Sequence, residues 1–101
     1  MPRYFNPNSM CPPFNPYSHG AEIKAGCRLV FVAGQVGADK DGNIAPDFEG
    51  QAHLAYANIE IILKDAGMTF ANLAKMTTFL INPDDGPKMR VIRKSFLQDI
   101  R

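Results

Sequence analysis

The chain has 101 residues, of which 46% are hydrophobic and 21% are charged, and its formal net charge at pH 7 is +1. This length fits one small domain, and the apolar fraction excludes an intrinsically disordered chain. A charge this close to zero produces no field that could hold nucleic acid or an acidic membrane across the whole molecule. Either partner would therefore need a local patch.

The sequence has no run of eighteen apolar residues, and it begins with a polar, proline-rich stretch. We therefore expect neither a membrane span nor a signal peptide, and a cytoplasmic location. Cys11 and Cys27 lack the paired spacings of a zinc site. They are interpreted as reduced thiols, with a structural disulfide as the alternative.

Residues 1–16 contain five of the eight prolines, mixed with Asn and Ser. Proline is excluded from helix interiors and from central strands, so we predict an extended N-terminal arm over 1–16. A single domain is predicted over 17–101. It begins with a short strand over 21–24, and the turn Ala25-Gly26 leads into a β-branched and aromatic strand over 27–33.

Helical periodicity begins at Phe48, with Asp47 as the predicted N-cap and Gly67 as the stop. One stripe of this helix is apolar: Ala52, Ala55, Ile59, Ile62, Leu63 and Ala66. Residues 73–82 are predicted to form another strand. A second helix follows the turn over 82–87, and its apolar face consists of Met89, Ile92, Phe96 and Ile100.

The predicted order is strand, strand, helix, strand, helix, which indicates an α+β fold with both helices on one face of the sheet. The strands over 27–33 and 73–82 are apolar on both of their faces. Two helices can cover only one face of such a sheet. We therefore expect a second copy of the protein to cover the other face, in a homo-oligomer.

Two short motifs have ordinary structural interpretations. Asp39, Asp41 and Gly42 resemble the start of a calcium loop, but the closing glutamate is absent, so a hairpin turn is expected. Gly34-Gln35-Val36-Gly37 follows a strand without opening a helix, which argues against a phosphate-binding loop. It is interpreted as a strand end where the backbone passes close to another group.

Histidines and basic residues give no evident catalytic set. His19 is too close in sequence to Ser18 for a nucleophilic pair, and His53 is interpreted as a polar helix residue. The second helix carries several cations: Lys88, Arg90, Arg93 and Lys94. A solvated face is the expected role, with an anionic ligand or RNA phosphates as alternatives.

Four passages in order resemble the RidA (YjgF) family of enamine/imine deaminases, a family formerly described as translation inhibitors. They are Asn15-Pro16-Tyr17-Ser18-His19-Gly20, the segment 29–36, the helix from Gln51 to Gly67, and the segment 73–80. The similarity covers nearly everything after Asn15.

The resemblance implies a chorismate-mutase-like fold and a homotrimer whose sheets form a central barrel, with active sites between subunits. It implies hydrolysis of reactive 2-imino acids, released by pyridoxal-phosphate enzymes from serine or threonine, to 2-keto acids and ammonia. No metal or cofactor is implied. By position, Tyr17 would face the substrate as the catalytic residue, Ala33 and Gly34 would line the pocket, and Arg90 would stand where many members have an Asn.

The sequence also departs from the family pattern. Ala33 replaces a usual Ser, and His19 replaces a Gln or similar residue. Family members continue after the second helix into two strands, which supply an arginine for the substrate carboxylate and a glutamate that positions water. The sequence stops at Arg101, before those strands, so we expect a C-terminally incomplete domain with impaired deaminase activity. The alternatives are a non-catalytic trimer that binds a small molecule or a protein, and a weak RNA-binding role.

Overall fold

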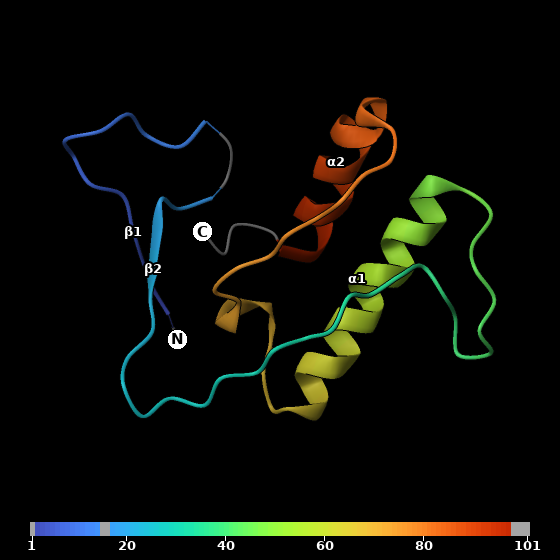
Figure 1. Ribbon diagram of the computed structural model, residues 1–101, viewed down its shortest axis with the longest axis horizontal. Coiled ribbons are helices and arrows are strands. Elements are labelled where there is room, and N and C mark those ends of the chain that lie inside the picture. The colour runs from blue at the N-terminus through green and yellow to red at the C-terminus, as the bar shows by residue number, and fades with distance from the viewer. Residues whose placement is uncertain (1, 15–16, 98–101) are drawn as a thin grey trace.

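The computed structural model describes residues 2–14 and 17–97 and shows an α+β architecture (Figure 1). Its elements in chain order are β1 (Arg3–Phe5), β2 (Gly20–Glu22), α1 (Phe48–Asp65), the short 3-10 helices η1 (Phe70–Asn72) and η2 (Pro83–Asp85), and α2 (Gly86–Leu97). Both predicted helices are confirmed. Ile100, placed on the face of the second helix, and Arg101 lie outside the described residues.

Helix α1 begins and ends where its sequence predicts. The Asp47 side chain accepts a hydrogen bond from the Gly50 backbone N–H at 2.9 Å, which satisfies one of the free donors of the first turn. Ala66 caps the other end, and Gly67 adopts a φ of 74°, a conformation that glycine enters without a side-chain penalty.

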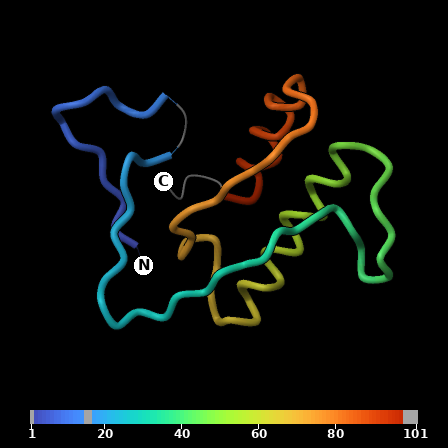
Figure 2. Tube along the Cα trace, viewed as in Figure 1, coloured from blue at the N-terminus to red at the C-terminus, as the bar shows by residue number. Residues whose placement is uncertain are grey.

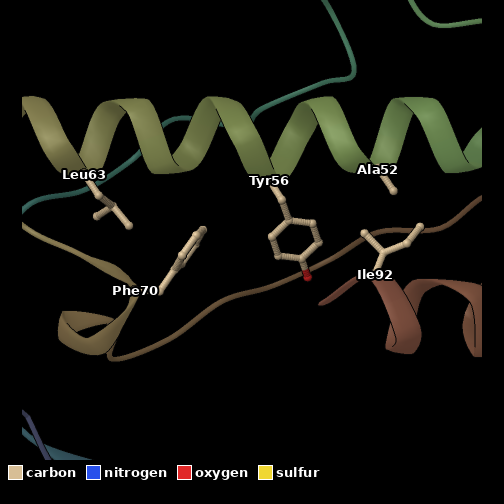
Figure 3. Packing of buried hydrophobic residues seen from close by; sticks show 5 residues of the cluster. All are labelled: Ala52, Tyr56, Leu63, Phe70 and Ile92. Atoms are coloured by element: carbon tan, nitrogen blue, oxygen red, sulfur yellow. The ribbon is translucent and has the colours of Figure 1, made fainter. Parts of the chain in front are cut away.

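The core lies between α1, η1 and α2 (Figure 3). Five side chains are buried there: Ala52, Tyr56, Leu63, Phe70 and Ile92. The ring of Tyr56 stacks on that of Phe96, with centroids 5.3 Å apart and planes 15° apart. Ala52, Leu63 and Ile92 come from the predicted apolar stripes, whereas Tyr56 was not predicted to be in the core, and the helix pair is the packed unit of the fold.

The arm contributes a strand of its own. Residues 3–5 form β1, which pairs antiparallel with β2 in the register Arg3 with Glu22 and Phe5 with Gly20. Pro2 and Pro7 flank these three residues, so the N–H groups that the strand needs are all present. The Tyr4 hydroxyl donates to the carbonyl oxygens of Ala71, at 3.4 Å, and Leu73, which fastens the hairpin to the region of η1.

The predictions of strands over 27–33 and 73–82 are wrong for the described chain. Both segments run along the helix pair, but neither belongs to a hydrogen-bonded ladder (Figure 2). A ladder needs a neighbouring strand, and among the described residues neither segment has one. The first segment is instead held by α1 and its C-cap. Arg28 donates to the Ala66 carbonyl at 2.9 Å, and Asn58 donates to the Ala38 carbonyl at 2.9 Å.

In both segments, half-buried and exposed apolar side chains nevertheless alternate as they do along a β-strand. Val32 in the first, and Met76 and Leu80 in the second, are half-buried. Four alternating apolar side chains on the opposite face are exposed: Leu29 at 63%, Phe31 at 91%, Phe79 at 91% and Ile81 at 105%. In the described chain, the helices therefore leave one side of each segment uncovered, although the two segments do not form the expected sheet. We call these four residues the outer apolar face.

Candidate functional site

Tyr17 lies in the N-terminal hairpin, three residues before β2, and is 42% exposed. Its ring packs edge-to-face on the ring of His19, with centroids 5.8 Å apart and planes 89° apart. The His19 backbone N–H donates to the Asn6 side chain at 2.7 Å. The Tyr17 phenol therefore lies at the surface, and the bond between His19 and Asn6 holds the backbone two residues further on.

Ala33 and Gly34 lie in the first extended segment and are both exposed. The Ala33 carbonyl accepts from the Gln35 side chain at 3.2 Å, and no atom lies within 4 Å of where a Cβ on Gly34 would stand. The close approach predicted for this glycine-containing stretch occurs at Gly37 instead. A Cβ there would lie 2.3 Å from the Cα of Gln51 in α1.

Arg90 lies on the exposed side of α2. Among the described residues it forms no ion pair, whereas Lys88 on the same helix lies 4.0 Å from the Glu49 carboxylate of α1. A guanidinium left free at the surface can bind a carboxylate through two parallel hydrogen bonds. Arg90 is therefore chemically able to hold an anionic substrate.

The structure does not bring the four predicted site residues together within one chain. In the parts of the chain that it describes, no hydrogen bond, ion pair or ring contact joins any two of Tyr17, Ala33, Gly34 and Arg90. The hairpin that carries Tyr17 lies on one side of the molecule and α2 on the other (Figure 1).

The structure also contains a surface hollow that the sequence did not predict. It has a volume of about 260 Å³ and lies between the first turn of α1 and the end of the second extended segment, with these lining residues: Phe48, Gln51, Phe79, Leu80, Ile81, Asn82 and Asp85. Its walls combine apolar and polar surface in similar amounts, with Asp85 at the end of η2. Sequence patterns could not reveal it, because two elements far apart along the chain form it together.

The Asp39 turn is confirmed as a hairpin turn. The Asp39 carboxylate accepts the backbone N–H groups of Asp41 and Asn43, each at 2.9 Å, and Ala38 bridges to Ile44. The Asn43 bond above all lowers the pKa of Asp39 below its ordinary value. The described residues contain no group of three or more His, Cys, Asp or Glu side chains that could hold a metal ion.

Two further expectations concern the cysteines and the membrane. Cys11 and Cys27 are both exposed and unpaired, as interpreted from their spacing. Over the described ranges, 2–14 and 17–97, no helix combines the length and the hydropathy that a bilayer crossing requires.

Comparison with known proteins identifies the class. The model of the Endoribonuclease L-PSP family matches residues 8–101. The RutC family protein YjgH of Escherichia coli K12 is 39% identical over 69 residues, which are 68% of this chain and 52% of YjgH. The 2-iminobutanoate/2-iminopropanoate deaminase of Mus musculus is 33% identical over 85 residues, 82% of this chain and 61% of the mouse protein.

The fold agrees with a solved structure. A crystal structure from Thermotoga maritima MSB8, described as an endoribonuclease, matches with a TM-score of 0.69 and 21% identity, and covers 100% of this chain and 79% of that one. This chain therefore belongs to the endoribonuclease L-PSP family, the family of the RidA (YjgF) proteins, as its four sequence passages indicate. It spans about half of the length of YjgH.

Proposed function

We propose that the protein is a RidA-like deaminase that hydrolyses reactive 2-imino acids to 2-keto acids and ammonia in the cytoplasm. The observation that carries the proposal is the 33% identity, over 82% of the chain, to the mouse protein named as a 2-iminobutanoate/2-iminopropanoate deaminase. The surface phenol of Tyr17 and the free guanidinium of Arg90 supply a hydrogen-bonding group and an anion-binding group for such a substrate.

The proposed hydrolysis requires few groups from the protein. Water adds to the electrophilic imine carbon, the resulting tetrahedral amine expels ammonia, and the carbon becomes a ketone. Imine and water give ketone and ammonia with no change of oxidation state, so the reaction needs no cofactor. Holding the carboxylate and orienting the water are the contributions that a protein can make. We assign the first to Arg90 and the second to the Tyr17 hydroxyl, with the exposed backbone at Ala33 and Gly34 lining the pocket.

The proposal includes assembly as a homotrimer, in which neighbouring copies could bring together residues that no hydrogen bond, ion pair or ring contact joins in the described chain. The outer apolar face supports it, since its four large apolar side chains are all highly exposed in the single chain and would leave water on packing against another copy. A second copy packed against this face would bury Phe31 and Phe79. It could also place Tyr17 of one subunit near Gly34 or Arg90 of the next.

The experiment is hydrolysis of 2-iminobutanoate generated in situ, followed as ammonia release and as suppressed semicarbazone formation. We expect slow but measurable turnover by the unmutated chain, since the family's two C-terminal strands are absent from the sequence, and about a 100-fold lower kcat/KM for Tyr17→Phe, a typical loss when a proton-handling group is removed. Tyr56→Phe is the matched control, because it removes a phenol hydroxyl from the core and should retain activity. Absence of turnover by the unmutated chain would overturn the proposal.

A second candidate is a non-catalytic trimer that binds an anionic metabolite through Arg90 and Arg93. It is favoured by one observation, the exposed Arg90 guanidinium, which forms no ion pair among the described residues. A ligand that binds only the folded state raises its apparent stability. A thermal shift with 2-ketobutanoate that disappears in Arg90→Gln, without imine turnover, would establish this function in place of the first.

A further inference from the structure

His19 connects three parts of the N-terminal hairpin. Its backbone N–H donates to the Asn6 side-chain oxygen at 2.7 Å, next to the end of β1. Its ring nitrogen Nε2 lies 2.7 Å from the Cys11 carbonyl oxygen. A carbonyl only accepts hydrogen bonds, which assigns the proton of the ring to Nε2. His19 is therefore held at two points, its backbone N–H and its ring nitrogen Nε2.

The third contact of His19 is with Tyr17. The two rings meet edge-to-face, with centroids 5.8 Å apart and planes 89° apart. The quadrupoles of aromatic rings favour this arrangement over a random approach. Because Tyr17 is 42% exposed, much of its ring has solvent around it, and the His19 ring is the aromatic surface that it packs against.

We propose that His19 is a positioning residue for Tyr17: its imidazole, fixed by Asn6 and by the Cys11 carbonyl, holds the Tyr17 ring at the angle from which the phenol meets the substrate. The inference rests on the proposed deaminase function, which gives Tyr17 its role. His19 itself touches no reacting atom. Without it, Tyr17 would sample several side-chain rotamers, and only a fraction of them would present the hydroxyl correctly.

A double-mutant cycle in the imine assay tests the proposal. We expect His19→Ala to lower kcat about 10-fold with little change in KM, since misplacing a group affects the chemical step more than binding. His19→Ala combined with Tyr17→Phe should be no slower than Tyr17→Phe alone, because His19 acts only through Tyr17. Additive losses would overturn the proposal, since they would show that His19 acts independently of Tyr17.

His53→Ala is the matched control, because His53 is the other histidine of the chain and lies exposed on α1. Its ring contacts Phe96 of α2, with centroids 5.8 Å apart. This substitution should leave kcat unchanged. A loss of kcat equal to that of His19→Ala would overturn the proposal by showing that any histidine substitution has this effect.

Nuclear magnetic resonance tests the contact without relying on turnover or on a variant. The chain has three tyrosines, so labelled tyrosine gives three ring signals that can be assigned. We expect a nuclear Overhauser effect between the Tyr17 and His19 rings in the unmutated protein, and its absence would overturn the inference. If the unmutated chain fails to hydrolyse imines, the deaminase proposal falls. The ring-to-ring effect then decides alone whether His19 positions Tyr17.

Discussion

At the scale of single residues, Tyr56 combines good packing with an unsatisfied polar atom. Its side chain is 3% exposed and stacks on Phe96, yet its hydroxyl forms no hydrogen bond that meets ordinary geometry among the described residues. Burial raises the pKa of this phenol above its ordinary value, and the charge of Arg93 and the side chain of Thr78 oppose part of the shift. A buried donor without a partner costs free energy that an apolar group of the same shape would not.

We therefore expect Tyr56→Phe to raise the free energy of unfolding at pH 7 by about 1 kcal/mol. Because the folded state keeps the phenol proton above pH 10 and the unfolded state releases it, the stability of the unmutated protein should fall as the pH rises beyond 10. The variant should lack this part of the loss. Urea unfolding at pH 7 and pH 11 measures both effects, and a less stable variant would contradict the prediction.

At the scale of elements, the sequence predicts what depends on neighbours along the chain. Asp47 and Gly67 mark the ends of α1 correctly, because capping involves only the adjacent turn. The segments over 27–33 and 73–82 have the expected alternation, but a ladder depends on a partner strand, and the sequence does not say where that partner lies. The close approach predicted for the stretch 34–37 does occur, at Gly37, but the sequence does not say that its neighbour is Gln51 of α1.

Gly37 and Gly34 form a matched pair for the packing of the first extended segment on α1. A Cβ at Gly37 would meet the backbone of Gln51, whose Cα and carbonyl oxygen would lie 2.3 and 2.7 Å away. We expect Gly37→Ala to lower the free energy of unfolding by about 1–3 kcal/mol, because backbone atoms must move to admit the methyl group. Gly34→Ala, which meets nothing within 4 Å, should leave it nearly unchanged. Equal values in urea unfolding would contradict this packing.

At the scale of the whole molecule, a single chain defines the fold better than it defines the candidate site. The helix pair, its core and the hairpin can be described within a single copy. The proposed site residues, by contrast, lie on separate elements that no contact joins in the described chain. The basic pattern of the second helix indicates Arg90 as a possible anion-binding residue, but the catalytic role of Tyr17 follows only from the resemblance, because no local pattern marks it.

The outer apolar face gives this proposed association a direct test. Phe79→Asp would place a charge where a second copy is expected to pack, and burying an unpaired charge is strongly unfavourable. We expect the unmutated protein to be a trimer by light scattering and Phe79→Asp to be a monomer. Val91→Asp is the control, because Val91 is 71% exposed on α2, outside this face, and should leave the trimer intact. A monomeric unmutated protein would rule out the assembly.

The bond between Tyr4 and the region of η1 has a consequence for synthesis on the ribosome. The Tyr4 hydroxyl reaches the Ala71 carbonyl across a separation of 67 residues. At about 5–20 residues per second, the acceptor is made roughly 3 to 13 seconds after the donor. The hairpin can pair β1 with β2 early, since both come from the first 22 residues. The hairpin cannot dock on the region of η1 until α1 and η1 have been made, so its attachment comes after the synthesis of α1 but does not require α2.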